Sequence, residues 1–292
     1  MTLLITSIKE ALDDFDVAVL DQWGVLHNGS QPYPFVASAV DLLRRNGKET
    51  IVLSNSGKRS DVNLKRIADI GIPVATISKV ITSGEALWED INVGRLQLAG
   101  RTPRKIFPIA GAALDAIEWV ADSVRIEIAA DLDESVDAIM LMGLEDGTPH
   151  DAYDDIFEKA LRFNKTLICS NPDKSSVRAG GLVISPGALA DRYAEMGGNV
   201  IWYGKPHSII FQAVSRSFPN TPPHRILMVG DSLEHDIAGA HSAGFKSAFI
   251  RGGLHAGDFA EAVNNETISR TIEDLAAQHG SGIPTYSLEF LA

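Results

Sequence analysis

The chain lacks the features that mark secreted, membrane-spanning or nucleic-acid-binding proteins. Its 292 residues include one cysteine, Cys169, so no intrachain disulfide can form and a reducing compartment is expected. No stretch approaches the roughly 20 apolar residues that a membrane helix needs, and the N-terminus lacks the pattern of a signal peptide. Lys and Arg are outnumbered by Asp and Glu, 26 to 38, without a local basic cluster, which disfavours nucleic acid and anionic lipid as partners. These absences favour a cytoplasmic protein.

The apolar residues that are present form short runs separated by segments with helical spacing. Apolar residues make up 45% of the chain and charged residues 22%, which is typical of a globular protein with a large core. Each run ends at a polar residue or a glycine, as expected for a buried parallel strand. The alternation predicts an α/β fold, a doubly wound parallel sheet of the Rossmann-like kind. The runs are 17–20, 50–53, 106–110, 138–142, 167–169, 200–203, 226–229 and 247–250.

Polar residues that follow these runs are the candidates for a site, because ligands of open parallel sheets bind beyond the carboxyl ends of the strands. Asp21, Ser54, Lys205 and Asp231 stand in such places. Between Ser54 and Lys205 lies a stretch with its own strand and helix pattern, long enough to be an inserted domain. We expect a core domain of residues 1–81 and 204–292 and an inserted α/β domain of residues 82–203.

Three of these positions carry groups that phosphoryl chemistry uses. Asp21 offers a carboxylate that can attack phosphorus, and a glycine turn follows it. Ser54, Asn55 and Ser56 offer hydroxyl, amide and backbone donors that could bind a phosphate oxygen, and Lys205 offers a fixed countercharge. Each motif in isolation is more often structural, as a strand terminus, a capping serine or a solvated lysine.

The fourth motif, from Gly230 to Ile237, is the most specific. It follows a buried run, opens a helical segment and contains Asp231 and Asp236. Carboxylates with one histidine and no cysteine nearby favour Mg²⁺ over Zn²⁺. The alternative is structural, with Asp231 as a helix cap and Asp236 in solvent. The order of all four motifs along one chain favours a shared site.

These motifs, in this order and spacing, resemble the haloacid dehalogenase superfamily, and specifically its NagD-like branch, in which a large α/β cap is inserted after the second motif. The resemblance covers nearly the whole chain. Segments of the inserted region contribute to it, together with the return to the core at Gly204, Lys205 and Pro206. The inserted segments are 82–86, 143–144 and 170–173.

The resemblance implies a magnesium-dependent hydrolase of small phosphorylated metabolites. Asp21 would form an aspartyl-phosphate, while Ser54 and Lys205 would bind the transferring group. Mg²⁺ would bind the Asp21 carboxylate, the backbone carbonyl of Trp23 and Asp231, with Asp236 supporting these ligands. The cap would close over the site and select the substrate, which the sequence leaves open among sugar phosphates, nucleotides and cofactor phosphates.

Trp23 departs from the family pattern, because phosphatases of the family carry a general acid at this position. An indole N–H cannot exchange a proton near neutral pH, and general acid–base help is typically worth about 10²–10⁴-fold. One interpretation is therefore a slow phosphatase, or one whose substrate has a good leaving group, with His27, His207 or Asp173 as substitutes for the acid. The alternative is a phosphometabolite-binding or regulatory protein.

A third interpretation is a dehalogenase, since haloacid dehalogenases also carry an aromatic residue where phosphatases have the acid. Those enzymes work without a metal and resemble this chain poorly in the cap, whereas Asp231 and Asp236 keep the magnesium pattern. This interpretation therefore ranks last. A homodimer is also considered, with cap surfaces pairing through apolar residues such as Trp88 and Trp119.

Overall fold

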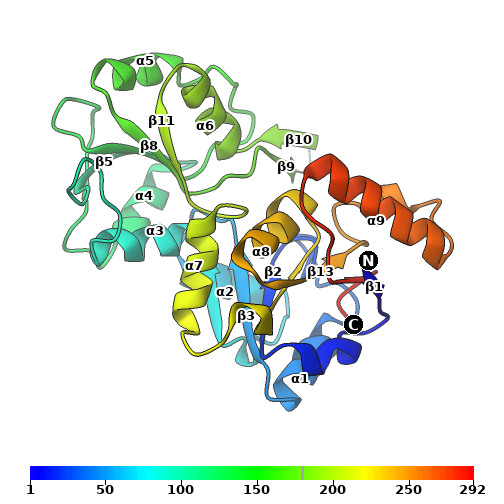
Figure 1. The fold of residues 1–292 in the computed structure, drawn as a ribbon. Coiled ribbons are helices and arrows are strands. Elements are labelled where there is room, and N and C mark those ends of the chain that lie inside the picture. The colour runs from blue at the N-terminus through cyan, green and yellow to red at the C-terminus, as the bar shows by residue number, and fades with distance from the viewer. Residues whose placement is uncertain (179–180) are drawn as a thin grey trace. The chain divides into compact units, whose positions relative to one another are not determined.

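The protein, described by a computed structural model over residues 1–178 and 181–292, divides into two compact units (Figure 1). The core unit comprises Met1–Ser54, Asp61–Ile81 and Lys205–Ala292. The second unit comprises Asn55–Ser60 and Thr82–Gly204. That residues 82–203 form a domain that acts as a cap stays a prediction. The short segment Asn55–Ser60 was not expected in the second unit.

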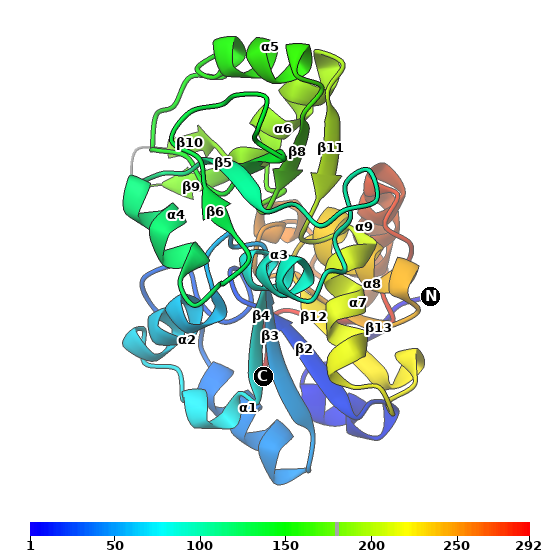
Figure 2. The same cartoon turned by 90° about the vertical axis from the view of Figure 1, so that its left-hand side faces the viewer.

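The core unit is built on a seven-stranded sheet with the order β1-β14-β13-β12-β2-β3-β4. The pairs from β1 through to β3 are parallel, and β12 and β2 pair from Ile226 opposite Val17 to Val229 opposite Leu20. Figure 2 shows β2, β3 and β4 side by side. Every residue of β2 and β12 is buried, which explains their uninterrupted apolar runs. The strands are β1 (Leu3–Leu4), β2 (Val17–Asp21), β3 (Glu49–Ser54), β4 (Lys79–Thr82), β12 (Ile226–Gly230), β13 (Lys246–Ile250) and β14 (Tyr286–Leu288).

Helices cover both faces of this sheet. On one face, Val40 and Leu43 of α1 join a cluster with Leu20 of β2. On the other, Ile272 of α9 packs with Phe249 of β13. The predicted doubly wound α/β class is therefore confirmed. The helices are α1 (Val36–Arg45), α2 (Ser60–Asp69), α7 (Ser208–Ser217), α8 (Ala238–Ala243) and α9 (Asn265–His279), with short 3₁₀ or π turns at Ile8–Asp14, Val74–Thr76, Pro223–Arg225, Leu233–Ile237 and Ala256–Phe259.

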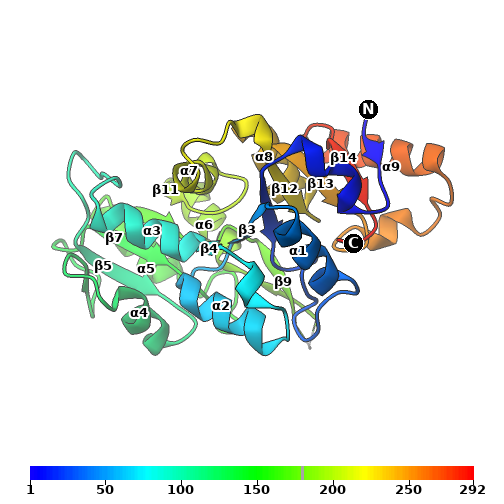
Figure 3. The same ribbon diagram turned by 90° about the horizontal axis from the view of Figure 1, so that it is seen from below.

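The second unit has its own parallel sheet of five strands, in the order β11-β8-β7-β5-β6, and a two-stranded antiparallel sheet of β9 and β10. Phe157 of α5 and Tyr193 of α6 pack together in its apolar cluster with Leu167 of β8. Figure 3 shows α3 and α4 in this unit with β5 and β7. The elements are α3 (Ser83–Asn92), β5 (Lys105–Ile109), α4 (Ala113–Val120), β6 (Glu127–Ile128), β7 (Ala138–Leu141), α5 (Asp154–Arg162), β8 (Thr166–Cys169), β9 (Ser175–Arg178), β10 (Gly181–Ile184), α6 (Pro186–Glu195) and β11 (Asn199–Trp202).

One surface expectation is wrong. Trp119 does not lie on a surface of the second unit, because only 1% of it is exposed and its indole N–H donates to the carbonyl of Gly84 at 2.9 Å. Trp88 is half-buried, with the Arg59 guanidinium 3.9 Å above its ring. Pairing through Trp119 is therefore excluded. Among the residues that the structure describes, no helix is both long and apolar enough to cross a membrane.

Candidate active site

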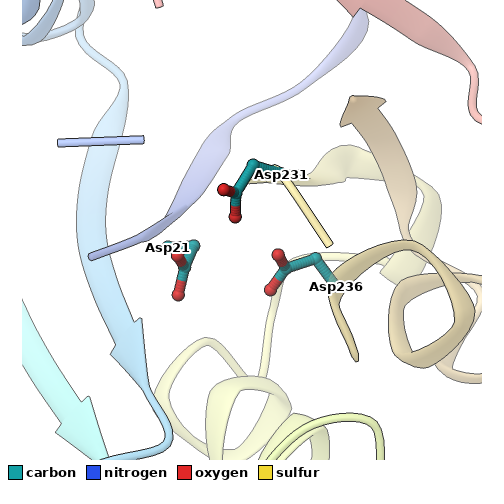
Figure 4. Close-up of side chains that lie close together, drawn as sticks. All are labelled: Asp21, Asp231 and Asp236. Atoms are coloured by element: carbon teal, nitrogen blue, oxygen red, sulfur yellow. The ribbon is translucent and has the colours of Figure 1, made fainter. Parts of the chain in front are cut away.

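Three buried carboxylates meet at the carboxyl ends of neighbouring strands of the core unit. Asp21 ends β2, Asp231 directly follows β12, and Asp236 lies in the helical turn Leu233–Ile237. One oxygen from each carboxylate lies within 4.8 Å of one from both others. Figure 4 shows the three side chains around one shared space. The pairing of β12 with β2 brings them together, although Asp21 and Asp231 lie far apart in the sequence.

Lys205 supplies the positive charge of this cluster. Its ammonium donates to Asp21 Oδ1 and, at 2.7 Å, to Asp236 Oδ1, and only 4% of its side chain is exposed. Burial alone would lower the pKa of Lys205, but the charges of the two carboxylates outweigh it and raise the pKa. Lys205 therefore stays charged at neutral pH.

One ammonium cannot balance three buried carboxylates. Burial, with the nearby Asp236 and Asp231, raises the pKa of Asp21 well above its usual range against the opposing effect of Lys205. Burial and Asp236 raise the pKa of Asp231 to about 7. Such a surplus of negative charge on hard oxygen atoms fits a divalent cation, and the all-carboxylate donor set fits Mg²⁺. The residues present therefore suit the predicted metal.

The other predicted phosphate-binding residues fall in different units. Ser54 ends β3, directly after Leu53, which pairs with Asp21 in the sheet register, and it is buried in the core unit. Asn55 and Ser56 belong to the second unit. There the Asn55 amide donates to Asp173 Oδ1 at 2.7 Å. The roles proposed for these residues stay predictions.

Trp23 is partly exposed and is packed against two neighbours. The Arg66 guanidinium lies 4.6 Å from the centre of its ring, and the ring of His27 lies 5.0 Å away, edge to face. His27 Nδ1 accepts the N–H of Gly29 at 3.0 Å, and Nε2 lies 3.1 Å from the amide of Gln22. Burial and then Arg66 lower the pKa of His27 to about 4. His27 is therefore neutral with both ring nitrogens engaged, which disfavours it as a substitute acid.

The sequence missed one group that contacts the cluster and one buried polar residue near Trp23. The backbone N–H of Leu254 donates to Asp231 Oδ2 at 2.7 Å. Gln22 is fully buried beside His27. The only sequence feature that could have identified the first is the glycine pair Gly252 and Gly253 after β13, while Gln22 carries no distinctive pattern.

Two family models match separate parts of the chain, and several known proteins are similar to it over nearly its full length. A family model described as haloacid dehalogenase-like hydrolase matches residues 18–111, and a second, HAD-hydrolase-like, matches residues 202–277. Chronophin of Rattus norvegicus is 25% identical, covering 98% of this chain and 89% of its own. Glycerol-3-phosphate phosphatase of Homo sapiens is 26% identical, covering 89% of this chain and 86% of its own. The crystal structure of a haloacid dehalogenase-like hydrolase from Brucella suis 1330 superposes with a TM-score of 0.78 at 25% identity, covering 99% and 100% of the two chains.

The doubly wound α/β sheet carries buried carboxylates and a lysine at its strand ends, and its relatives are named as phosphatases, so the chain is a phosphatase-type hydrolase. The two family models together span more than half of the chain. The chain therefore belongs to the haloacid dehalogenase superfamily, in its NagD-like branch, as its motifs indicated.

Proposed function

We propose that this chain, a phosphatase-type hydrolase by its family, hydrolyses a small phosphorylated metabolite with Asp21 as its nucleophile and Mg²⁺ as its cofactor. The observation that carries the proposal is the buried cluster in which Lys205 bonds both Asp21 and Asp236 while Asp231 lies within reach of both carboxylates. A carboxylate held beside a fixed ammonium is suited to meet a phosphoryl group, because phosphoryl transfer depends mostly on positioning and on balancing charge.

In the proposed reaction, a carboxylate oxygen of Asp21 attacks phosphorus, and the bond from phosphorus to the leaving oxygen breaks with its electron pair. Lys205 and Ser54 bind oxygens of the transferring group. Water then hydrolyses the aspartyl-phosphate and releases inorganic phosphate. Asp21, Asp231 and the Trp23 carbonyl, supported by Asp236, would hold Mg²⁺, which would offset the negative charge of the phosphoryl oxygens.

Because Trp23 stands where a general acid is expected, the rate of hydrolysis should depend on the leaving group of the substrate. The indole cannot protonate a departing oxygen, and His27 is neutral and engaged at both nitrogens. We therefore propose slow hydrolysis of alkyl phosphates and faster hydrolysis of substrates such as aryl phosphates, whose leaving group departs unprotonated.

A second candidate is a phosphometabolite-binding protein, which the partly exposed, well-packed Trp23 also favours. Dehalogenation remains the weakest alternative, since the carboxylate cluster suits a metal that this chemistry does not use. We also propose a cytoplasmic location, on the ground that the single thiol Cys169 can form no intrachain disulfide.

The test is hydrolysis of 4-nitrophenyl phosphate with and without Mg²⁺ by the wild type, Asp21→Asn and Cys169→Ala. We expect magnesium-dependent release of 4-nitrophenol that falls by about 10³-fold or more in Asp21→Asn, as for other removed nucleophiles, and persists in Cys169→Ala. If Asp21→Asn kept full activity, Asp21 would not be the nucleophile. Binding of phosphorylated metabolites without any turnover would instead favour the binding protein.

The role of Trp23 is tested with a series of phosphate esters whose leaving groups differ in pKa. In the wild type the rate should fall steeply as the leaving-group pKa rises. Trp23→Asp should restore proton donation and raise turnover of alkyl phosphates by about 10²–10⁴-fold. A shallow dependence on leaving-group pKa in the wild type would mean that another residue already supplies the proton, and a steep dependence that persists in Trp23→Asp would mean that position 23 does not reach the leaving oxygen.

A further inference from the structure

Asp231 is held by a loop that no sequence motif identified. The loop follows β13, and the backbone N–H of Leu254 donates to Asp231 Oδ2 at 2.7 Å. Leu254 as a whole is 67% exposed, and it contributes to the cluster through its backbone N–H. A charge-assisted hydrogen bond of this kind fixes the direction of the carboxylate.

Two glycines confine the same carboxylate. Gly24, with φ of 83°, follows β2, and Gly253 follows β13. Asp231 Oδ2 is the nearest atom at both positions: a Cβ would lie 1.7 Å from it at Gly24 and 2.3 Å from it at Gly253. At Gly24 the Cβ would also lie 2.7 Å from Oδ1, whereas at Gly253 the other close atoms are Cβ and Cγ of Asp231. Any larger residue at either position would therefore displace the carboxylate, whereas glycine leaves a slot that accepts Oδ2.

The loop itself is anchored to the C-terminal segment. The N–H of Arg251 donates to the carbonyl of Leu288 at 2.9 Å, and that of Gly252 to Glu289 at 2.8 Å. These bonds extend the pairing of β13 with β14, which ends with Ile250 opposite Leu288. Leu254 lies two residues beyond this extension of the sheet, in a turn whose start is anchored by these bonds.

We propose that Gly24, Gly253 and the Leu254 N–H are positioning groups that occupy Asp231 Oδ2 and leave Oδ1 as its single ligand oxygen for a divalent cation. The proposal rests on the metal site of the proposed function. A carboxylate restricted to one oxygen suits Mg²⁺, which takes a small octahedral set of ligands, better than Ca²⁺, which accepts both oxygens and a looser geometry. The slot therefore favours Mg²⁺ over Ca²⁺.

The experiment measures cation binding directly, by calorimetric titration of the metal-free protein with Mg²⁺ or Ca²⁺ in the absence of substrate. Gly253→Ala should weaken Mg²⁺ binding by about 10–100-fold, the usual effect of disturbing a group that orients a metal ligand, and should weaken Ca²⁺ binding less. Gly257→Ala is the matched control, because a Cβ there would meet nothing within 4 Å. It should bind both cations like the wild type.

A second pair of variants covers the case in which Gly253→Ala does not fold. Leu254→Pro removes the N–H donor, and Leu254→Ala keeps it while removing the same exposed side chain. We expect weakened Mg²⁺ binding in Leu254→Pro alone, with melting curves to confirm that both are folded. If folded Gly253→Ala and Leu254→Pro bound Mg²⁺ as tightly as the wild type, the proposed positioning of Asp231 would be wrong. Equal losses of Mg²⁺ affinity in the controls Gly257→Ala and Leu254→Ala would also contradict it. A wild type that binds no Mg²⁺ would overturn the metal site itself.

Discussion

Asp21 and Cys169 occupy equivalent places in the two units, and they differ in what surrounds them. Each is the last residue of a buried strand in a parallel sheet, β2 in the core unit and β8 in the second. Burial raises the pKa of both, to about 12 for the Cys169 thiol, whose Sγ donates to the carbonyl of Asn171 at 3.1 Å. Asp21 also has Lys205 against it, with Asp231 and Asp236 alongside. The two strand ends therefore differ in the groups that distant segments bring to them, and at Asp21 these groups form the candidate site.

Among the variants that test this difference, removal of the Lys205 ammonium should cause the largest loss of stability. In Lys205→Met the carboxylates of Asp21 and Asp236 would stay buried without their shared countercharge. We expect a loss of about 3–5 kcal/mol in the free energy of unfolding, measured by urea titration at neutral pH without Mg²⁺. The loss should shrink as the pH falls, because protonation of the carboxylates relieves their repulsion. A change close to zero at neutral pH would mean that Lys205 does not balance these charges.

The buried Cys169 thiol should make the stability of the protein depend on pH above neutrality. Its folded-state pKa lies above its unfolded value, so its contribution to stability is present below the unfolded pKa and is lost as the pH rises toward about 12. Relative to Cys169→Ala, the wild type should lose about 1–2 kcal/mol of unfolding free energy between pH 8 and pH 10. Parallel pH profiles of the two proteins would contradict the burial of the thiol.

An ion pair within the second unit should show the smallest effect. Arg192 and Asp154 form a bond there, but 29% of each side chain is exposed, against 4% for Lys205. Solvent screens such a pair, so Arg192→Met should lower the melting temperature by no more than about 3 °C. The melting temperature of Lys205→Met is measured alongside. If Arg192→Met lowered the melting temperature as much as Lys205→Met does, burial would not explain the difference between the two ion pairs.

The strands themselves were predictable because their determinants are local. All eight apolar runs are strands, since a strand buried on both faces needs consecutive apolar residues. The strands that were not predicted, β1, β4, β6, β9, β10 and β14, are short and span two to four residues each. Asp21 and Asp231 were identifiable for the same local reason, as polar residues at or just after the ends of buried runs.

The sequence alone determined the class of fold, the family and the carboxylates that end its strands, because each depends on residues near one another in the chain. The tertiary structure decided which groups face those carboxylates. Lys205 meets Asp21 across 184 residues, and the Leu254 N–H meets Asp231 across 23. Such contacts depend on the strand order and on loop geometry, which apolar periodicity does not encode. For the same reason Trp119, which was expected on a cap surface, is buried, and its indole N–H donates to the carbonyl of Gly84.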